Sequence, residues 1–255
     1  MINSKPLQTV VSDDWISCPR PNPRAKTRLF CFPYAGSGVA TFYPWLAHIS
    51  ANVELCFINL PGRETRLREA PYTQLAVLAE TLTEALYKFL DKPFAFFGHS
   101  MGALICFEVV RQIRRRYTLQ PAHIFVSAHR APQIPDPNPP LHHLSDENFL
   151  ETLQHRYGPL PAILLQDSEL MSLFLPILRA DLTLIETYLY QKDAPLSCPI
   201  SVFGGKHDHI ATEESLSAWQ AQTCDEFNLT MFAGDHFYLN KSSSLLVQQL
   251  NNALS

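Results

Sequence analysis

The stretch that decides the fold runs from Phe94 to Ala103 and reads FAFFGHSMGA. It contains the pattern Gly-x-Ser-x-Gly, with Ser100 at its centre, after a short apolar run and before a helical pattern. In that context the serine occupies a sharp strand-to-helix turn and its hydroxyl is exposed above the sheet. Gly98 and Gly102 lack the Cβ atoms that would clash where strand and helix approach closely. The stretch therefore predicts a nucleophilic serine at the positive N-terminus of a helix.

Apolar runs on both sides of this stretch predict the rest of a sheet. Each is strand-length, and its continuous apolarity is typical of parallel strands that are buried on both faces. Three-residue and four-residue apolar spacing predicts helices between them. Strands that alternate with helices indicate an α/β fold, with a mostly parallel sheet flanked by helices. The further strand runs are 28–32, 54–58, 122–128, 200–203 and 229–232, and the helical patterns are 73–90, 101–116 and 242–254.

One segment interrupts this alternation. Residues 131–140, APQIPDPNPP, are too rich in proline for a helix or an inner strand. Two helical patterns follow, at 145–157 and 167–190, with no strand between them. We therefore expect a core formed by residues 27–130 and 196–255, and a helical insertion at 131–195 that is either a lid or an embellishment. Residues 1–26 are polar and contain proline, and we expect an N-terminal arm there.

The composition excludes several classes of protein. Hydrophobic residues make up 46% of the 255 and charged residues 17%, which is typical of a globular chain. The formal net charge of −4 leaves no basic excess, so we expect no nucleic-acid binding. The N-terminus has no apolar signal region, and no apolar run reaches 18 residues. These features favour a soluble, cytoplasmic protein without a membrane partner.

The six cysteines have no metal or redox spacing. The closest two are thirteen residues apart, so no Cys-x-x-Cys pair exists. Several lie in apolar runs, and we expect buried free thiols in a reducing compartment. His207 and His209 flank Asp208, but two histidines without further ligands are more typical of a loop than of a metal site. The cysteines are at positions 18, 31, 56, 106, 198 and 224.

A serine hydroxyl needs a base to become a nucleophile. Eight histidines follow Ser100, and His236 stands out because it lies just beyond the last strand run. Asp208 follows the 200–203 run and a Gly-Gly turn, and it would orient the imidazole. The order Ser100, Asp208, His236 is that of α/β-hydrolases. Asp235 is a rival acid, but it adjoins His236, and adjacent side chains usually diverge.

An oxyanion hole requires two preorganised N–H donors. The backbone N–H of Met101, directly after the nucleophile, is one candidate. The second should come from the loop after the first core strand, FPYAGSG at 32–38, and we assign it to Ala35. The alternative is that these glycines make only an ordinary turn.

Six motifs occur in order along the chain: FPYAGSG (32–38), LPGRE (60–64), FGHSMG (97–102), LPILRAD (175–181), FGGKHDH (203–209) and GDHFYL (234–239). Together they resemble the type II thioesterases, the discrete α/β-hydrolases that accompany nonribosomal peptide and polyketide synthases. The resemblance runs in order from about residue 27 to the end. It implies a triad of Ser100, Asp208 and His236 and a helical lid over an acyl chamber. One departure is the loop Ala35-Gly36-Ser37-Gly38, where the family often has Ala-Gly-Gly.

The same resemblance implies a reaction and a partner. The reaction is hydrolysis of acyl, aminoacyl or peptidyl thioesters on the phosphopantetheine arm of carrier proteins, which clears misprimed groups without a metal or redox cofactor. The candidates for docking an acidic carrier are Arg63, Arg66 and Arg68, although Arg63 could instead brace its loop against Glu64 or Glu69. We expect a monomer. The alternatives are a small-molecule carboxylesterase with the same triad and a noncatalytic hydrolase-fold partner protein.

Overall fold

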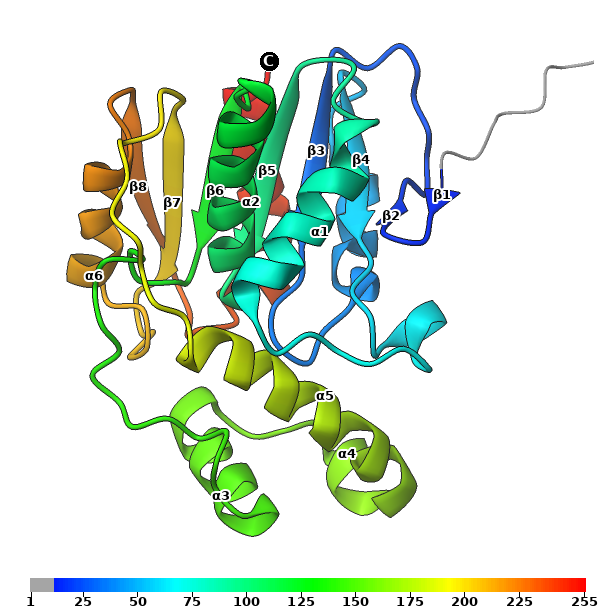
Figure 1. Ribbon diagram of the computed structural model, residues 1–255, viewed down its shortest axis with the longest axis vertical. Helices are drawn as coiled ribbons and strands as arrows, with labels where there is room; N and C mark the ends of the chain where they lie inside the picture. The colour runs from blue at the N-terminus through cyan, green and yellow to red at the C-terminus, as the bar shows by residue number, and fades with distance from the viewer. Residues whose placement is uncertain (1–11) are drawn as a thin grey trace, which may run out of the picture.

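A computed structural model describes residues 12–255, and these form one twisted sheet with helices on both sides (Figure 1). The strand order is β1-β2-β4-β3-β5-β6-β7-β8. All neighbours from β4 to β8 are parallel, whereas β1 and β2 pair antiparallel at one edge. The strands are β1 (Ser12–Asp13), β2 (Ile16–Ser17), β3 (Thr27–Phe32), β4 (Val53–Ile58), β5 (Phe94–His99), β6 (His123–Ser127), β7 (Ile200–Gly205) and β8 (Phe227–Phe232).

The continuous apolar runs correctly indicated a parallel sheet. Every residue of β3, β4, β5, β6 and β7 is buried, while β8, at the edge, is largely half-buried. Two apolar layers cause this burial, one on each face of the sheet. The α/β-hydrolase fold expected from the sequence is thus the fold of the chain.

The two faces are covered by different helices. On one face, α1 (Leu75–Tyr87) and α2 (Met101–Tyr117) pack against the sheet, as the front of Figure 1 shows. On the other face, Phe42 and Trp45 of η1 (Val39–Ala47) share a core with Leu246 and Leu250 of α7 (Ser243–Ala253). Shorter helices complete the connections: η2 (Glu64–Arg66), α6 (Glu213–Ser217), η3 (Ala218–Gln222) and η4 (Tyr238–Asn240).

The insertion between β6 and β7 forms α3 (Asp146–Tyr157), α4 (Ala162–Gln166) and α5 (Ser168–Glu186). Ser145 and Asp167 cap α3 and α5, because their side chains accept hydrogen bonds from backbone N–H groups of the first turn. In Figure 1 the three helices lie at the end of the sheet toward which the parallel strands point. No helix among the described residues is long and apolar enough to cross a membrane.

The N-terminal segment differs from the expected arm. Its first eleven residues lie outside the described part, but β2 hydrogen-bonds with β4 and extends the sheet. Ser17 is the register partner of Phe57, which brings Cys18 beside Cys56. This segment is therefore an edge of the core from residue 12 onward.

The expectation of six free thiols is wrong for one pair. Cys18 and Cys56 form a disulfide with a Cα–Cα distance of 4.4 Å. Their separation of 38 residues gave no signal in the sequence, because only the pairing of β2 with β4 brings them together. Of the free cysteines, Cys31, Cys106 and Cys198 are buried as expected, and Cys224 is exposed.

Candidate active site

Ser100 lies at a strained turn between β5 and α2. Its φ of 51° and ψ of −117° are unusual for a residue with a side chain. A Cβ on Gly98 would lie 2.1 Å from the Gly102 carbonyl oxygen, and one on Gly102 would lie 2.2 Å from that of Phe32. The glycines are thus required by the close approach that the sequence predicted. The Ser100 N–H donates to the Ser127 carbonyl at 2.7 Å, which ties the turn to β6.

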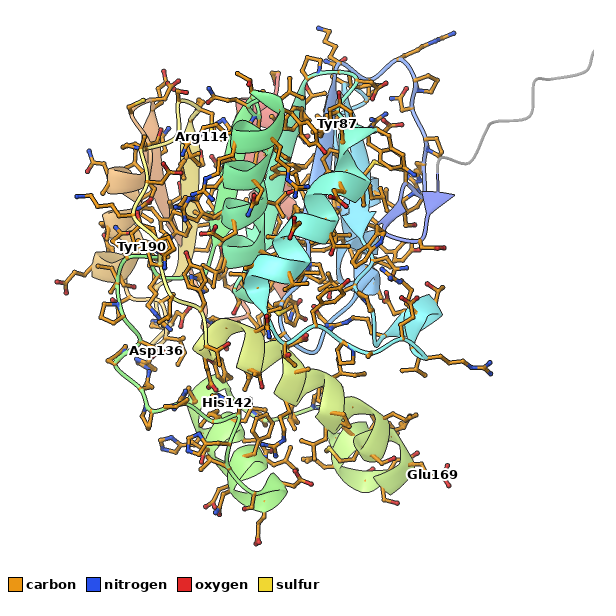
Figure 2. All side chains as sticks on the ribbon, in the orientation of Figure 1. Tyr87, Arg114, Asp136, His142, Glu169 and Tyr190 are labelled. Atoms are coloured by element: carbon orange, nitrogen blue, oxygen red, sulfur yellow. A yellow bond between two sulfur atoms is a disulfide. The ribbon has the colours of Figure 1, made fainter. Side chains whose placement is uncertain are left out.

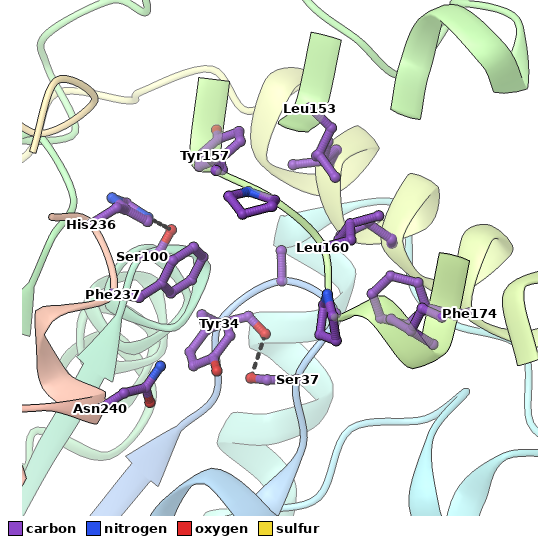
Figure 3. A pocket seen from close by; sticks show the side chains of 18 of the residues that line it. Tyr34, Ser37, Ser100, Leu153, Tyr157, Leu160, Phe174, His236, Phe237 and Asn240 are labelled. Carbon is purple, nitrogen blue, oxygen red and sulfur yellow. Dashed lines mark hydrogen bonds between the residues drawn. The ribbon is translucent and has the colours of Figure 1, made fainter. Parts of the chain in front are cut away.

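Three side chains from separate loops meet at this turn. The distance from His236 Nε2 to Ser100 Oγ is 3.0 Å (Figure 3). That from His236 Nδ1 to Asp208 Oδ2 is 2.8 Å. Asp208 Oδ1 accepts the backbone N–H groups of Ile210 and Ala211. With Nδ1–H donating to Asp208, Nε2 is left as an acceptor that faces the Ser100 hydroxyl.

The rival acid is placed differently. Asp235 is exposed, and its side chain accepts the backbone N–H of Phe237 at 2.9 Å. The Asp208 side chain, by contrast, is fully buried against His236. Of the two carboxylates, the structure brings Asp208 to the imidazole.

A second imidazole behind the site was not singled out from the sequence. His99 is fully buried, and its ring centroid lies 5.5 Å from that of His236. Its Nδ1 is 2.8 Å from Ser127 Oγ, which in turn is 2.5 Å from the Tyr238 hydroxyl. Burial, reinforced by the nearby His236, holds the pKa of His99 well below its usual value. His99 is therefore neutral and adds no positive charge beside His236.

Ser100 opens into an apolar cavity of about 380 Å³ beneath the insertion. Figure 3 shows its wall running from Tyr34 and Phe237 on the core side to Leu153 and Phe174 on the insertion side. The cavity size is within the range of small-molecule sites. Further lining residues are Ala35, Gly36, Ser37, Tyr157, Gly158, Pro159, Leu160, Pro161, Leu164, Leu178, Leu182, Ile185, His236 and Asn240.

The two expected oxyanion donors come from different elements next to Ser100. Met101 is the first residue of α2, where an N–H group has no acceptor within its own helix. Ala35 lines the cavity together with Ser100. It belongs to residues 34–40, the loop after β3 and the first two residues of η1, which we together call the oxyanion loop. The neighbouring Gly36 has a φ of +73°, so the glycine-rich sequence serves the turn of this loop.

Two of the three arginines proposed for docking are buried, which corrects that part of the prediction. The guanidinium of Arg66 pairs with Glu69 at 2.8 Å and lies 3.9 Å from the centre of the Trp15 ring. The guanidinium of Arg63 forms an ion pair with Asp181 of α5, rather than with Glu64 or Glu69. Both side chains are sequestered because the insertion and the N-terminal segment cover this loop. Arg68 is exposed.

The arginines at the end of α2 have a structural role. Arg114 and Arg115 pair with Asp193 at 2.8 and 2.9 Å. In Figure 2, Arg114 lies at one end of α2, far from the insertion, which carries the labelled residues His142 and Glu169. This position fits cations that stabilise a helix C-terminus.

Asp208 is fully engaged in hydrogen bonds, although His207 and His209 flank it. Its two oxygens accept from His236, Ile210 and Ala211. Within residues 12–255, no three His, Cys, Asp or Glu side chains are grouped closely enough to bind one metal ion.

A serine held at a strained strand-to-helix turn, with a histidine and a buried aspartate from later loops of the same parallel sheet, defines a serine hydrolase of the α/β-hydrolase fold. Comparison with known proteins narrows that class. The thioesterase domain family matches residues 27–254, and the chain belongs to this family.

Its relatives come from biosynthetic pathways. The gramicidin S biosynthesis protein GrsT of Aneurinibacillus migulanus is 46% identical and covers 92% of this chain and 91% of its own. The thioesterase PikA5 of Streptomyces venezuelae is 35% identical, with 94% and 84% covered. Among solved structures, the RedJ thioesterase of the prodiginine pathway in Streptomyces coelicolor superposes with a TM-score of 0.84. It is 38% identical and covers 91% of this chain and 92% of its own.

Proposed function

We propose that this thioesterase hydrolyses acyl, aminoacyl or peptidyl thioesters on the phosphopantetheine arm of carrier proteins, in an editing role beside a nonribosomal peptide or polyketide synthase. The observation that carries the proposal is the apolar cavity of about 380 Å³ that opens at Ser100, because an acyl chain can lie there while its carbonyl meets the hydroxyl. The relatives' names supply the pathway context: gramicidin S biosynthesis for GrsT and the prodiginine pathway for RedJ.

The proposed reaction has two displacements. Ser100 Oγ attacks the thioester carbonyl while His236 Nε2 accepts its proton. The C–S bond then breaks, and His236 returns that proton to the departing thiolate. A water molecule next attacks the acyl-serine, again giving a proton to His236, and the free acid leaves as Ser100 regains its hydrogen. Asp208 holds the imidazole orientation throughout, and none of these steps uses a metal or redox cofactor.

Both tetrahedral intermediates carry a negative oxygen that requires N–H donors. We assign these to the backbone of Met101 and Ala35. Their support is the position of Met101 at the first turn of α2 and that of Ala35 in the cavity wall beside Ser100. The positive end of the α2 dipole adds to the same stabilisation.

The test compares hydrolysis of one acyl group from a thioester and from an oxygen ester. The same acyl chain is presented as an acyl-carrier-protein thioester and as a simple ethyl ester, and kcat/KM is measured for each. We expect the thioester to be preferred strongly. A higher kcat/KM for the ester would instead identify a carboxylesterase.

The Ser100→Ala variant separates a catalyst from a binding protein. We expect it to fold normally and to lose turnover and fluorophosphonate labelling, because the hydroxyl is the nucleophile. A wild-type protein that neither labels nor turns over would be a noncatalytic partner. A variant that retained a tenth of wild-type turnover would contradict the proposed triad.

Carrier docking now depends on Arg68, the exposed arginine of the original three. Arg68→Glu should raise KM for an acyl-carrier substrate, and do so less at high salt, while leaving a small acyl-pantetheine thioester unaffected. The matched control is Arg24→Glu, an exposed arginine before the amino end of β3, which should change KM for neither substrate. If Arg68→Glu leaves KM for the carrier substrate unchanged, the docking surface lies elsewhere.

A further inference from the structure

A buried ion pair joins the insertion to the core beside the active site. Arg63, in the loop after β4, donates from Nη1 to Asp181 Oδ2 at 2.8 Å and from Nη2 to Asp181 Oδ1 at 2.7 Å. The two side chains are 7% and 3% exposed. Two parallel charge-assisted bonds of this kind fix both the separation and the orientation of their partners. The position of α5 is thus tied to that of the loop after β4.

The same pair also holds the backbone of the oxyanion loop. The Gly36 N–H donates to Asp181 Oδ2 at 2.8 Å, and Arg63 Nη1 donates to the Ser37 carbonyl at 3.0 Å. The peptide between Ala35 and Gly36 is therefore bound by Asp181, and the peptide between Ser37 and Gly38 by Arg63. One of these peptides directly follows Ala35, so its orientation restricts the backbone that carries the proposed donor.

Glu64, the residue after Arg63, holds the C-terminal end of the oxyanion loop. The Glu64 carboxylate accepts the N–H groups of Val39 and Ala40 at 2.9 and 3.1 Å. Glu64 itself adopts a φ of 48°, a conformation that costs free energy for a residue with a side chain. Arg63 and Glu64 together thus restrain the loop on both sides of its glycines.

Helix α5 also contacts Gly36 through apolar atoms. A Cβ on Gly36 would lie 3.0 Å from the Phe174 ring and 3.2 Å from Leu178 Cδ1. Phe174, Leu178 and Asp181 are spaced by four and three residues, which places them on one face of the helix. If α5 moved away, Asp181 and this apolar wall would leave the oxyanion loop together.

We propose that Asp181 and Arg63 are positioning residues for the oxyanion hole, and that they make the active geometry of the loop depend on α5 being seated. The inference rests on hydrolysis at Ser100 as proposed above. Replacing a buried ion pair by apolar side chains is often neutral for stability, so stability alone does not explain this pair. Oxyanion donors act only within a few tenths of an ångström of the correct place, so holding the loop in place has a direct effect on the rate.

The decisive variant is Arg63→Met combined with Asp181→Leu, which removes both charges and leaves no unpaired buried ion. We expect kcat for a small acyl-pantetheine thioester to fall by about ten- to a hundredfold, with KM changed less than about twofold. The matched control is Arg28→Met with Glu54→Leu, another buried ion pair, with side chains 7% and 3% exposed, in the strands β3 and β4. We expect its kcat to match the wild type.

A second measurement separates positioning from general attachment of the insertion. Ser100 Oγ adds to the carbonyl of an alkyl trifluoromethyl ketone, its proton passes to His236, and the resulting hemiketal oxyanion lies in the hole. The product acid forms no such adduct. We expect the inhibition constant of the ketone to rise by the same factor as kcat falls, while the affinity for the product acid stays constant. Equal loss for ketone and acid, or no loss of kcat, would overturn the proposal.

Two single substitutions at Asp181 test the proposal if the double variant does not fold. Asp181→Asn and Asp181→Ala both break the ion pair, but only Asn retains an oxygen that can accept the Gly36 N–H. We expect kcat to be higher for Asp181→Asn than for Asp181→Ala, and equal values would overturn the role of that hydrogen bond. Ser100→Ala run alongside shows whether the measured hydrolysis uses Ser100, so failure of the proposed function is recognised separately.

Discussion

Replacing Asp208 by Asn should disable the histidine while leaving the loop in place. Asp208 Oδ1 accepts the N–H groups of Ile210 and Ala211 at 2.8 and 3.2 Å, and Oδ2 accepts from His236. An asparagine placed with its NH₂ toward the two N–H groups would lose both bonds, at about 1–3 kcal/mol for each unsatisfied group. Its oxygen therefore faces those donors and its NH₂ faces His236.

That orientation reverses the imidazole. Facing a donor, Nδ1 must become the acceptor, so the proton moves to Nε2, which lies 3.0 Å from Ser100 Oγ. A protonated Nε2 of a neutral ring cannot accept the serine proton. The equivalent change in a serine protease triad lowers kcat by about 10⁴, which at 1.36 kcal/mol per factor of ten is about 5 kcal/mol. We expect a loss of this order here, with little change in stability.

Asp235→Asn is the matched control, since Asp235 also follows a strand and its side chain also accepts a backbone N–H, that of Phe237. An asparagine oxygen can accept the same bond, so we expect kcat within about twofold of wild type. The assay follows thiol release from a small acyl thioester with a thiol-reactive chromophore, alongside thermal unfolding of each variant. If Asp235→Asn lost more activity than Asp208→Asn, or Asp208→Asn retained a tenth of wild-type kcat, the assignment of the acid would be refuted.

Three further predictions concern the chamber, the disulfide and pH. Leu164→Phe should shift the preference toward shorter acyl chains, because Leu164 lines the cavity. Leu165→Phe should not shift it, because that side chain is 51% exposed. The preference is measured as kcat/KM over a series of acyl chain lengths. Reducing Cys18–Cys56, which closes a loop of 38 residues, should lower the free energy of unfolding by up to about 4 kcal/mol, measured by urea titration with and without reductant. Burial lowers the pKa of His129 to about 3 against an unfolded value near 6.5, so the unfolded chain binds more protons in that interval. His129 alone should therefore lower the free energy of unfolding by about 2 kcal/mol between pH 7 and pH 5. The free energy is measured by urea titration at both pH values, and an equal decline in His129→Gln would contradict the prediction.

The sheet could be predicted because each inner strand carries its own signal. Six apolar runs marked the six parallel strands, and the structure extends most of them by one or two residues. The extensions include His99 and Gly205, whose residue types do not favour a strand but whose backbones continue the ladder of their neighbours. The helical pattern that starts at Thr73 predicted Thr73 as its N-cap, but α1 begins at Leu75 and its N-cap is Gln74, whose side chain makes no capping hydrogen bond.

What the sequence could not supply are contacts between distant segments that lack a periodic pattern. The pairing of Cys18 with Cys56 depends on β2, a strand of two residues, which is too short to show alternation. The catalytic residues could be predicted because each follows a segment with a clear pattern. Ser100, Asp208 and His236 each directly follow a strong strand signal, and parallel strands place their carboxyl ends at one edge.

The arginines proposed for docking show that the burial of a loop residue has to be inferred from the helix that packs on the loop. Arg63 lies at the expected edge of the sheet, but neither docking nor a brace against Glu64 or Glu69 is its role, since it pairs with Asp181. A loop carries no periodicity from which the burial of its charged residues can be inferred. The informative signal was on the other partner. Asp181 shares a helix face with Phe174 and Leu178, and an acid on an apolar face requires a buried cation. Arginines in loops at the carboxyl edge, beneath an insertion with such an acid, should therefore be considered as its partner before they are considered as docking residues.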